Sequence, residues 1–170
     1  GSTDHSRGMK YGVRYRHHSD GDSCQNGSDV VFRNVDWKDF YDGGVLTADG
    51  HAFKIDGFMR LGNVIVEGCT FENFGYEALR ISNTENAPDL GGALDSLYVG
   101  NCTFTNIDAE GIRYYSLDNV DDPPVVIEHI TFNNSATRTM YLKNSEGAIV
   151  RDIIIANSRM SGHGRDSELM

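Results

Sequence analysis

The stretch "NVIVEGCTFENF", residues 63–74, predicts a strand, a bend and a second strand, and the pattern returns in "DSLYVGNCTFTNI", residues 95–107. Cys, Thr and Phe follow one another in both copies. Similarity that recurs along a chain is typical of a solenoid, in which each repeat covers the apolar face of its neighbour. The sequence therefore indicates a series of structural repeats.

Five segments align with this stretch without a gap. Their first, third, sixth and eighth positions are almost all apolar. A spacing of two indicates strand residues that face inward, and the single spacing of three indicates a bend at the fifth position, where Asn34, Gly68, Asn101, His129 and Asp152 stand. The segments are "VVFRNVDWKDF" from Val30, "VIVEGCTFENF" from Val64, "LYVGNCTFTNI" from Leu97, "VVIEHITFNNS" from Val125 and "AIVRDIIIANS" from Ala148.

A second short strand is expected after each aromatic position. Its inward column holds Val13, Val45, Leu79, Ile112 and Met140, and the insertions between repeats are expected to follow this strand. The predicted second strands are "YGVRYRH" from Tyr11, "GGVLTAD" from Gly43, "EALRISN" from Glu77, "EGIRYYS" from Glu110 and "RTMYLKN" from Arg138.

These patterns predict an all-β fold, a right-handed parallel β-helix of about five to six coils, over residues 11–158. Residues 1–10 are expected to form an N-terminal tag or cap, and residues 159–170 a C-terminal tail or cap. A leucine-rich repeat would need more Leu, and a β-sandwich would have no reason to repeat residue identity. The end coils are expected to meet another chain end to end, or a neighbouring domain.

Composition excludes several classes of function. A formal charge of −10 and a pI near 4.9 argue against nucleic-acid binding, which needs a concentrated basic surface. No apolar run is long enough to span a membrane. Three cysteines without a C-x-x-C suggest neither a disulfide framework nor a zinc site. Cys69 and Cys102 share one inward column and are predicted to be reduced core residues, whereas Cys24 lies in a polar loop.

Basic and aromatic residues gather in the outward columns of the second strand. Arginine forks match carboxylate or sulfate oxygens, and tyrosine rings offer flat surfaces to sugars. An alternative remains open, because Glu77 with Arg80 and Glu110 with Arg113 would also make ordinary surface ion pairs. The candidate ligand-binding residues are Arg14, Arg16, Glu77, Arg80, Glu110, Arg113, Tyr115, Arg138, Tyr141 and Lys143.

The V-x-V-x-G/N-C/I-T-F core and the E-x-L/I-R strand that follows it resemble the pectate-lyase-like superfamily of parallel β-helices. The resemblance is particularly to its carbohydrate-active branch, which includes chondroitinase B-type and alginate lyases. It implies a polysaccharide partner and a bacterial protein that is secreted, or located at the cell surface or in the periplasm. These motifs are specific for architecture and weak for activity.

Two functions are compatible with these residues. The chain is expected to bind an extended, anionic polysaccharide along one sheet, as a carbohydrate-binding module or part of a polysaccharide-degrading protein. The alternative is a polysaccharide lyase that cleaves a uronate polymer by β-elimination, with Arg113, Tyr115 and Lys143 as base and acid. The sequence establishes no cofactor, and Ca²⁺ is the one candidate. The loops "HHSDGDS", residues 17–23, and "LDNVDDP", residues 117–123, offer oxygens to Ca²⁺, or serve only as turns.

Overall fold

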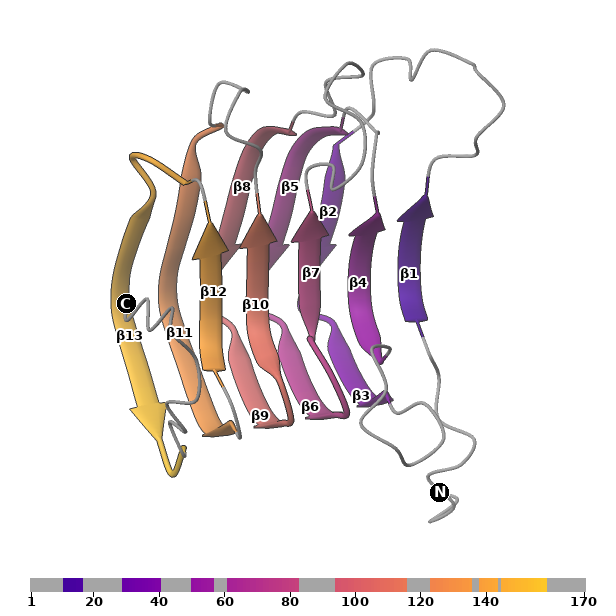
Figure 1. Cartoon of the computed structure of the whole chain (residues 1–170), viewed down its shortest axis with the longest axis vertical. Coiled ribbons are helices and arrows are strands. Elements are labelled where there is room, and N and C mark those ends of the chain that lie inside the picture. Colours follow the sequence, from indigo (N-terminus) through magenta and orange to yellow (C-terminus); the bar gives the residue numbers. More distant parts are fainter. Residues whose placement is uncertain are drawn as a thin grey trace.

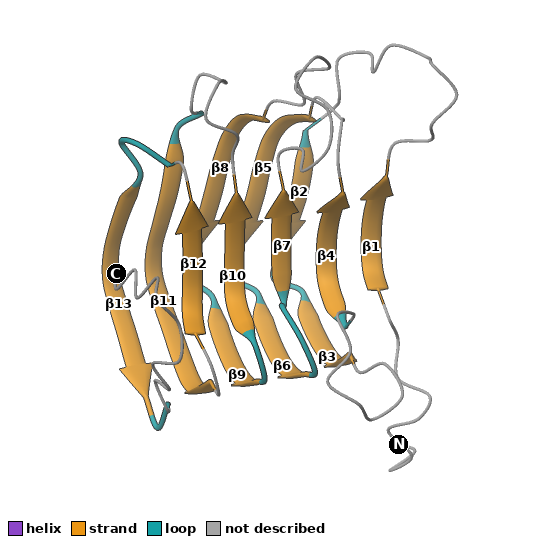
Figure 2. Ribbon diagram, in the orientation of Figure 1, coloured by secondary structure: helices purple, strands orange, loops and turns teal. Residues whose placement is uncertain are grey.

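A computed structural model describes residues 11–16, 29–40, 50–56, 61–82, 94–115, 123–135, 138–143 and 145–158. Every regular element in these ranges is a β-strand (Figure 2). The strands form two sheets that face each other, and the chain passes from one sheet to the other and back (Figure 1). The all-β prediction is therefore confirmed for the described residues.

Sheet A contains five parallel strands in the order β1-β4-β7-β10-β12. Strands that are neighbours in sheet A are not consecutive in the sequence, because the chain passes through the other sheet between them. The bounds are β1 (Tyr11–Arg16), β4 (His51–Asp56), β7 (Leu79–Ser82), β10 (Glu110–Tyr115) and β12 (Arg138–Lys143).

Sheet B is parallel as well and is bent, so that most repeats contribute two short strands to it. In the last two repeats one strand continues through the bend (Figure 1). The bounds are β2 (Val30–Arg33), β3 (Asp36–Phe40), β5 (Leu61–Glu67), β6 (Thr70–Phe74), β8 (Leu94–Gly100), β9 (Thr103–Ile107), β11 (Val125–Ser135) and β13 (Ile149–Ala156).

The register of sheet B confirms the five-segment alignment. Val66 pairs with Val99, Val99 with Ile127, and Ile127 with Val150. Because parallel strands stack identical positions, apolar residues form columns that run through the space between the sheets. In one column Phe71, Phe104 and Phe132 are at most 1% exposed. Their ring centroids are 4.6 Å apart from Phe71 to Phe104 and 5.0 Å from Phe104 to Phe132.

Two backbone bends recur in the repeats, and only one was predicted. The predicted bend is confirmed, since Asn34, Gly68, Asn101, His129 and Asp152 all have positive φ, between 54° and 62°. A second column of positive φ contains Asp39, Asn73, Asn106, Asn134 and Asn157. Asn and Asp tolerate this left-handed conformation better than other side chains.

The second bend is tied together by side-chain amides. Asn73 donates to Asp39 at 2.9 Å, Asn106 to Asn73 at 2.9 Å, and Asn134 to Asn106 at 2.7 Å. Each donor belongs to the later repeat, so this asparagine ladder has one direction. It connects neighbouring repeats at the sharp turn that leads from sheet B toward sheet A.

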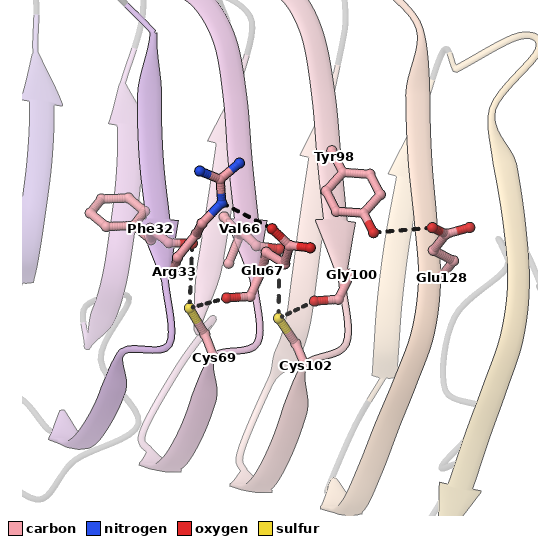
Figure 3. Close-up of polar contacts among 9 residues, drawn as sticks. All are labelled: Phe32, Arg33, Val66, Glu67, Cys69, Tyr98, Gly100, Cys102 and Glu128. Carbon is pink, nitrogen blue, oxygen red and sulfur yellow. Dashed lines mark hydrogen bonds and ion pairs between the residues drawn. The ribbon is translucent and has the colours of Figure 1, made fainter.

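The cysteines of the repeat lie in the core, as predicted. Cys69 and Cys102 are free thiols and only 1% exposed. Figure 3 shows both thiols directed at backbone carbonyls: Cys69 donates to Glu67 at 3.4 Å and Cys102 to Gly100 at 3.1 Å. Cys24 lies outside the described residues.

One predicted strand was placed incorrectly. In the second strand position of that repeat, sheet A contains His51–Asp56, whereas residues 43–49 lie outside the described residues. Phe53, instead of Val45, fills the inward column, and its ring lies 5.1 Å from that of Phe32. The connection from β3 to β4 is therefore longer than those of later repeats, so the insertions do not all follow the second strand.

In sheet A a small residue precedes each member of the inward column, and the reason is steric. At Gly12 a Cβ atom would lie 2.5 Å from the Trp37 ring, and at Gly111 it would lie 2.5 Å from the Phe132 ring. Ala52 and Ala78 occupy the same register position on β4 and preceding β7, and both are fully buried. The two sheets thus approach closely at this position, where only Gly, Ala or Thr is present.

Candidate functional site

Cationic side chains occupy one register position on four adjacent strands of sheet A. Arg14 on β1 pairs with Lys54 on β4, Lys54 with Arg80 on β7, and Arg80 with Arg113 on β10. Tyr141 on β12 is the next residue in the row. The residue that precedes each of them in the sequence belongs to the inward column and faces the core. These side chains therefore project from the opposite face of the sheet. Like charges in direct register are unfavourable, and this row therefore needs compensation.

Glu77 supplies part of that compensation from a buried position. It immediately precedes the small residue before β7, and its side chain is 0% exposed. One carboxylate oxygen, Oε1, lies 2.5 Å from Arg113 Nη1, and the other, Oε2, lies 3.5 Å from Arg80 Nη1. Burial acts to lower the pKa of Arg113, but the hydrogen bond to Glu77 and the negative charges of Glu77 and Glu110 raise it overall. Glu77 thus holds two arginines of neighbouring repeats.

His51 borders the same carboxylate. Its ring is 0% exposed, with Nδ1 2.9 Å from the backbone oxygen of Glu77 and 3.6 Å from the Oε2 atom. Tyr76 makes an edge contact with the His51 ring at 5.6 Å between centroids. Burial, followed by the negative charge of Glu77, raises the pKa of Tyr76. The His51 and Glu77 side chains, which lie beneath the arginines, are therefore polar and shielded from water.

Glu110 repeats the arrangement one strand further along. Its side chain is 6% exposed and its Oε1 atom lies 3.1 Å from Arg138 Nε. Burial raises the pKa of Glu110, and the nearby charge of Glu77 raises it further, while Arg138 and Arg113 act in the opposite direction. Burial and the charge of Glu77 together therefore disfavour the ionised form of Glu110.

The raised pKa of Glu110, caused first by burial and then by the charge of Glu77, predicts a pH dependence for Glu110→Gln. A carboxyl group whose folded-state pKa lies above its ordinary value of 4.5 contributes stability while protonated, and this is lost as pH rises through the folded-state pKa. The substitution removes that loss. We expect the stability of the variant relative to wild type to improve from pH 4 toward pH 7, measured by urea unfolding at each pH.

Glu128 offers a control of opposite sign. Arg151 and Tyr98 lower the pKa of Glu128 by hydrogen bonding, so its contribution is present at neutral pH and is lost as pH falls. Glu128→Gln should therefore lose most relative to wild type at neutral pH. Parallel pH profiles for the two variants would contradict the electrostatics described for Glu110.

Aromatic rings complete the site at its β10–β12 end. The Arg113 guanidinium carbon lies 5.2 Å from the centroid of the Tyr141 ring, and that of Arg138 lies 5.0 Å from it. Lys143 Nζ lies 4.8 Å from the centroid of the Tyr115 ring. These are cation–π distances. Lys54 lies in the same row but is only 7% exposed. We call the group formed by the following residues the cation face: Arg80, Arg113, Tyr115, Arg138, Tyr141 and Lys143.

Most of the residues proposed from sequence come together in or beside the cation face. Arg14 lies in register at its far end, and the side chain of Arg16 lies outside the described part of the structure. Arg113 contacts Glu77 of the preceding repeat, so the expected surface pair with Glu110 is not the closest one. Glu77 does contact Arg80, as the alternative of local ion pairs expected, but the carboxylates of Glu77 and Glu110 are buried instead of solvated. The residues brought together are Glu77, Arg80, Glu110, Arg113, Tyr115, Arg138, Tyr141 and Lys143.

Sequence reasoning missed His51, Lys54 and Tyr76. The first two were lost because the strand in their repeat was placed at residues 43–49. A signal was present: "HAFKID", residues 51–56, matches "EALRIS", residues 77–82, in its Ala, its basic residue and its Ile. Matching polar as well as apolar positions would have found Lys54.

No group of three or more potential metal ligands exists among the described residues. The proposed calcium loop at residues 17–23 and all but the last residue of the one at 117–123 lie outside them. Nor do the described ranges contain a helix long and apolar enough to cross a membrane.

No known protein family, curated protein or solved structure matches this chain. Any functional conclusion therefore rests on the cation face itself.

Proposed function

We propose that the two sheets are walls of a right-handed parallel β-helix of the pectate-lyase-like kind, and that its cation face binds an extended anionic polysaccharide. The observation that carries the proposal is the register of Arg80 on β7, Arg113 on β10 and Tyr141 on β12 in a chain with a net charge of −10. A row of like charges costs stability. Glu77 and Glu110 offset part of this repulsion from beneath, and an anionic polymer would offset more of it from the solvent side.

The spacing of the strands suits a polymer that lies across them. Neighbouring strands are ~4.8 Å apart, so equivalent side chains recur at about the length of one sugar residue. The ligand would then run along the stack of repeats, meeting one basic or aromatic residue per strand. The Arg113, Tyr141 and Arg138 group provides both charge and a flat ring at adjacent positions.

Arg113 is suited to contact the ligand although it already binds Glu77. A guanidinium group has five N–H donors, and the contact with Glu77 is made through Nη1. The side chain is 25% exposed. Glu77 therefore fixes the orientation of the fork while leaving part of it toward solvent, where carboxylate or sulfate oxygens would accept hydrogen bonds.

The lyase alternative receives less support from the geometry. Its proposed base would have to lose a proton, but the charges of Glu77 and Glu110 raise the pKa of Arg113. Tyr115 and Lys143 contact each other at the outer end of the face, away from the buried carboxylates. We therefore propose binding, in a bacterial protein that acts outside the cell or in the periplasm.

The test is calorimetric titration of wild type, Arg113→Ala and Arg113→Lys with alginate, chondroitin sulfate and a sulfated galactan. We expect Arg113→Ala to lower affinity by ~1.5–3 kcal/mol, the range for hydrogen bonds to charged groups. Arg113→Lys should also lose affinity because the planar fork is gone. Binding should weaken with added salt, since exposed charges are screened over about 8 Å at physiological ionic strength.

Arg33→Ala is the matched control. Arg33 is an exposed arginine on sheet B that pairs with Glu67 at 2.9 Å, outside the cation face (Figure 3). Its removal should leave affinity unchanged. Absence of binding by wild type to any acidic or neutral glycan would refute the proposal, and release of an unsaturated, ultraviolet-absorbing product would establish the lyase instead.

A further inference from the structure

Strand β13 ends sheet B with an apolar edge. It pairs with β11 on one side, and no other described strand pairs with its second side. Three of the four large exposed hydrophobic residues in the described ranges lie on it: Ile149 at 52%, Ile154 at 61% and Ile155 at 43%. An edge strand with such side chains is a template for another strand.

The sequence around β13 is close to a palindrome in chemical character. In "SEGAIVRDIIIANS", residues 145–158, the midpoint falls between Arg151 and Asp152. Moving outward from the midpoint, an aliphatic residue faces an aliphatic residue: Val150 with Ile153, and Ile149 with Ile154. Two antiparallel copies centred here would therefore match apolar with apolar and positive with negative charge.

Side-chain direction follows the same symmetry because of the bend. In a regular strand, two residues separated by an odd number of positions lie on opposite faces. Here the positive φ of Asp152, 56°, interrupts the alternation at the midpoint. Val150 and Ile153 both pack against the core, whereas Ile149 and Ile154 are both exposed. Opposed residues would thus point to the same side of the joined sheet.

We propose that β13 pairs antiparallel with β13 of a second copy of this chain, so that Arg151 of each copy lies opposite Asp152 of the other. This contact is isologous and closes after two copies. It extends sheet B by main-chain hydrogen bonding and covers the exposed isoleucines. Within a single chain, Arg151 contacts Glu128, and Asp152 contacts His129 at 3.4 Å. Both β13 residues are exposed.

A head-to-tail stack of copies is less favourable. Among the described strands, β2 and β3 form the other edge of sheet B. Continuing the register past β13 would place Arg151 beside Arg33, because both occupy the position of Glu67, Gly100 and Glu128 in the repeat. It would also place Asp36 beside Ile154. Charged edges discourage strand pairing.

Sedimentation equilibrium of the full chain tests the proposal. Ile149→Lys places a charge in the proposed contact between the two β13 strands. Val31→Lys is the matched control, since Val31 is 45% exposed and occupies the same outward column at the opposite edge of sheet B. We expect a concentration-dependent wild-type dimer, a dissociation constant raised roughly tenfold or more by Ile149→Lys, and no change with Val31→Lys. A wild-type monomer at all concentrations, or an equal effect of Val31→Lys, would overturn the proposal.

Disulfide trapping tests the register. In a Cys24→Ser background, Ile149→Cys chains mixed with Ile154→Cys chains should form a covalent dimer with oxidised glutathione, and neither chain alone should do so to the same extent. Equal trapping in the separate samples would refute the antiparallel register. A monomer in which the β13 amides that point away from β11 are protected from hydrogen exchange would overturn the proposal and assign the edge to another segment of the same chain.

Discussion

Replacing Phe104 by alanine should destabilise the protein by about 3–5 kcal/mol, the range for removal of a buried aromatic side chain. The Phe104 ring is 0% exposed and lies between the rings of Phe71 and Phe132. Neither neighbour can move into the space, because each is held in its own strand by the register of sheet B. The cavity should therefore persist, which places the cost at the upper part of the range.

Urea unfolding followed by far-UV circular dichroism measures this effect. Thr105→Ala on the same strand is the matched control, since Thr105 is half-buried and lies on the other face of β9. It should change stability by less than about 1 kcal/mol. A similarly small loss for Phe104→Ala would show that the aromatic column does not support the core.

Glu77→Gln should be the second costly substitution, with a loss of about 2–3 kcal/mol. The change keeps the size of the side chain but removes the negative charge that faces Arg80 and Arg113. Breaking a fully buried ion pair costs more. Water reaches these arginines, whose side chains are 14% and 25% exposed, and that reduces the expected loss.

The control for this substitution is Glu72→Gln on β6. Glu72 pairs with Lys38 at 3.2 Å, and both side chains are exposed, so a loss below about 1 kcal/mol is expected. Thermal and urea unfolding of the two variants give the comparison. Equal losses would mean that burial adds nothing to the Glu77 contacts, and the cation face would then be an ordinary charged surface.

Sheet B was predictable because its apolar spacing changes from two to three at one position in every repeat. That change located the bend at Asn34, Gly68 and Asn101 and aligned the five segments. In sheet A the inward column was correct for Leu79, Ile112 and Met140. It failed where a longer connection preceded β4, because a short apolar stretch fixes neither the length of a loop nor the choice between two similar strands.

The candidate site was predictable in composition but not in its pairing. Alternation along β7 and β10 places Arg80 and Arg113 on the outer face, as expected from sequence. Arg113 pairs with Glu77, a buried carboxylate of the preceding repeat, and neither this burial nor this contact between repeats could be predicted from sequence. Spacing along one strand carries no information on contacts between strands.

The direction of the asparagine ladder bears on how the chain reaches its native state. Asn73, Asn106 and Asn134 each donate to a residue that is synthesised earlier, and the first acceptor, Asp39, ends the series with a carboxylate that offers no amide hydrogen. A newly made repeat therefore finds its acceptor already in place on the growing polypeptide. The contacts span about one repeat of sequence, so closing each new loop costs little extra entropy. The ladder thus lets each of these repeats make its amide hydrogen bond to a residue that already exists when the repeat is synthesised.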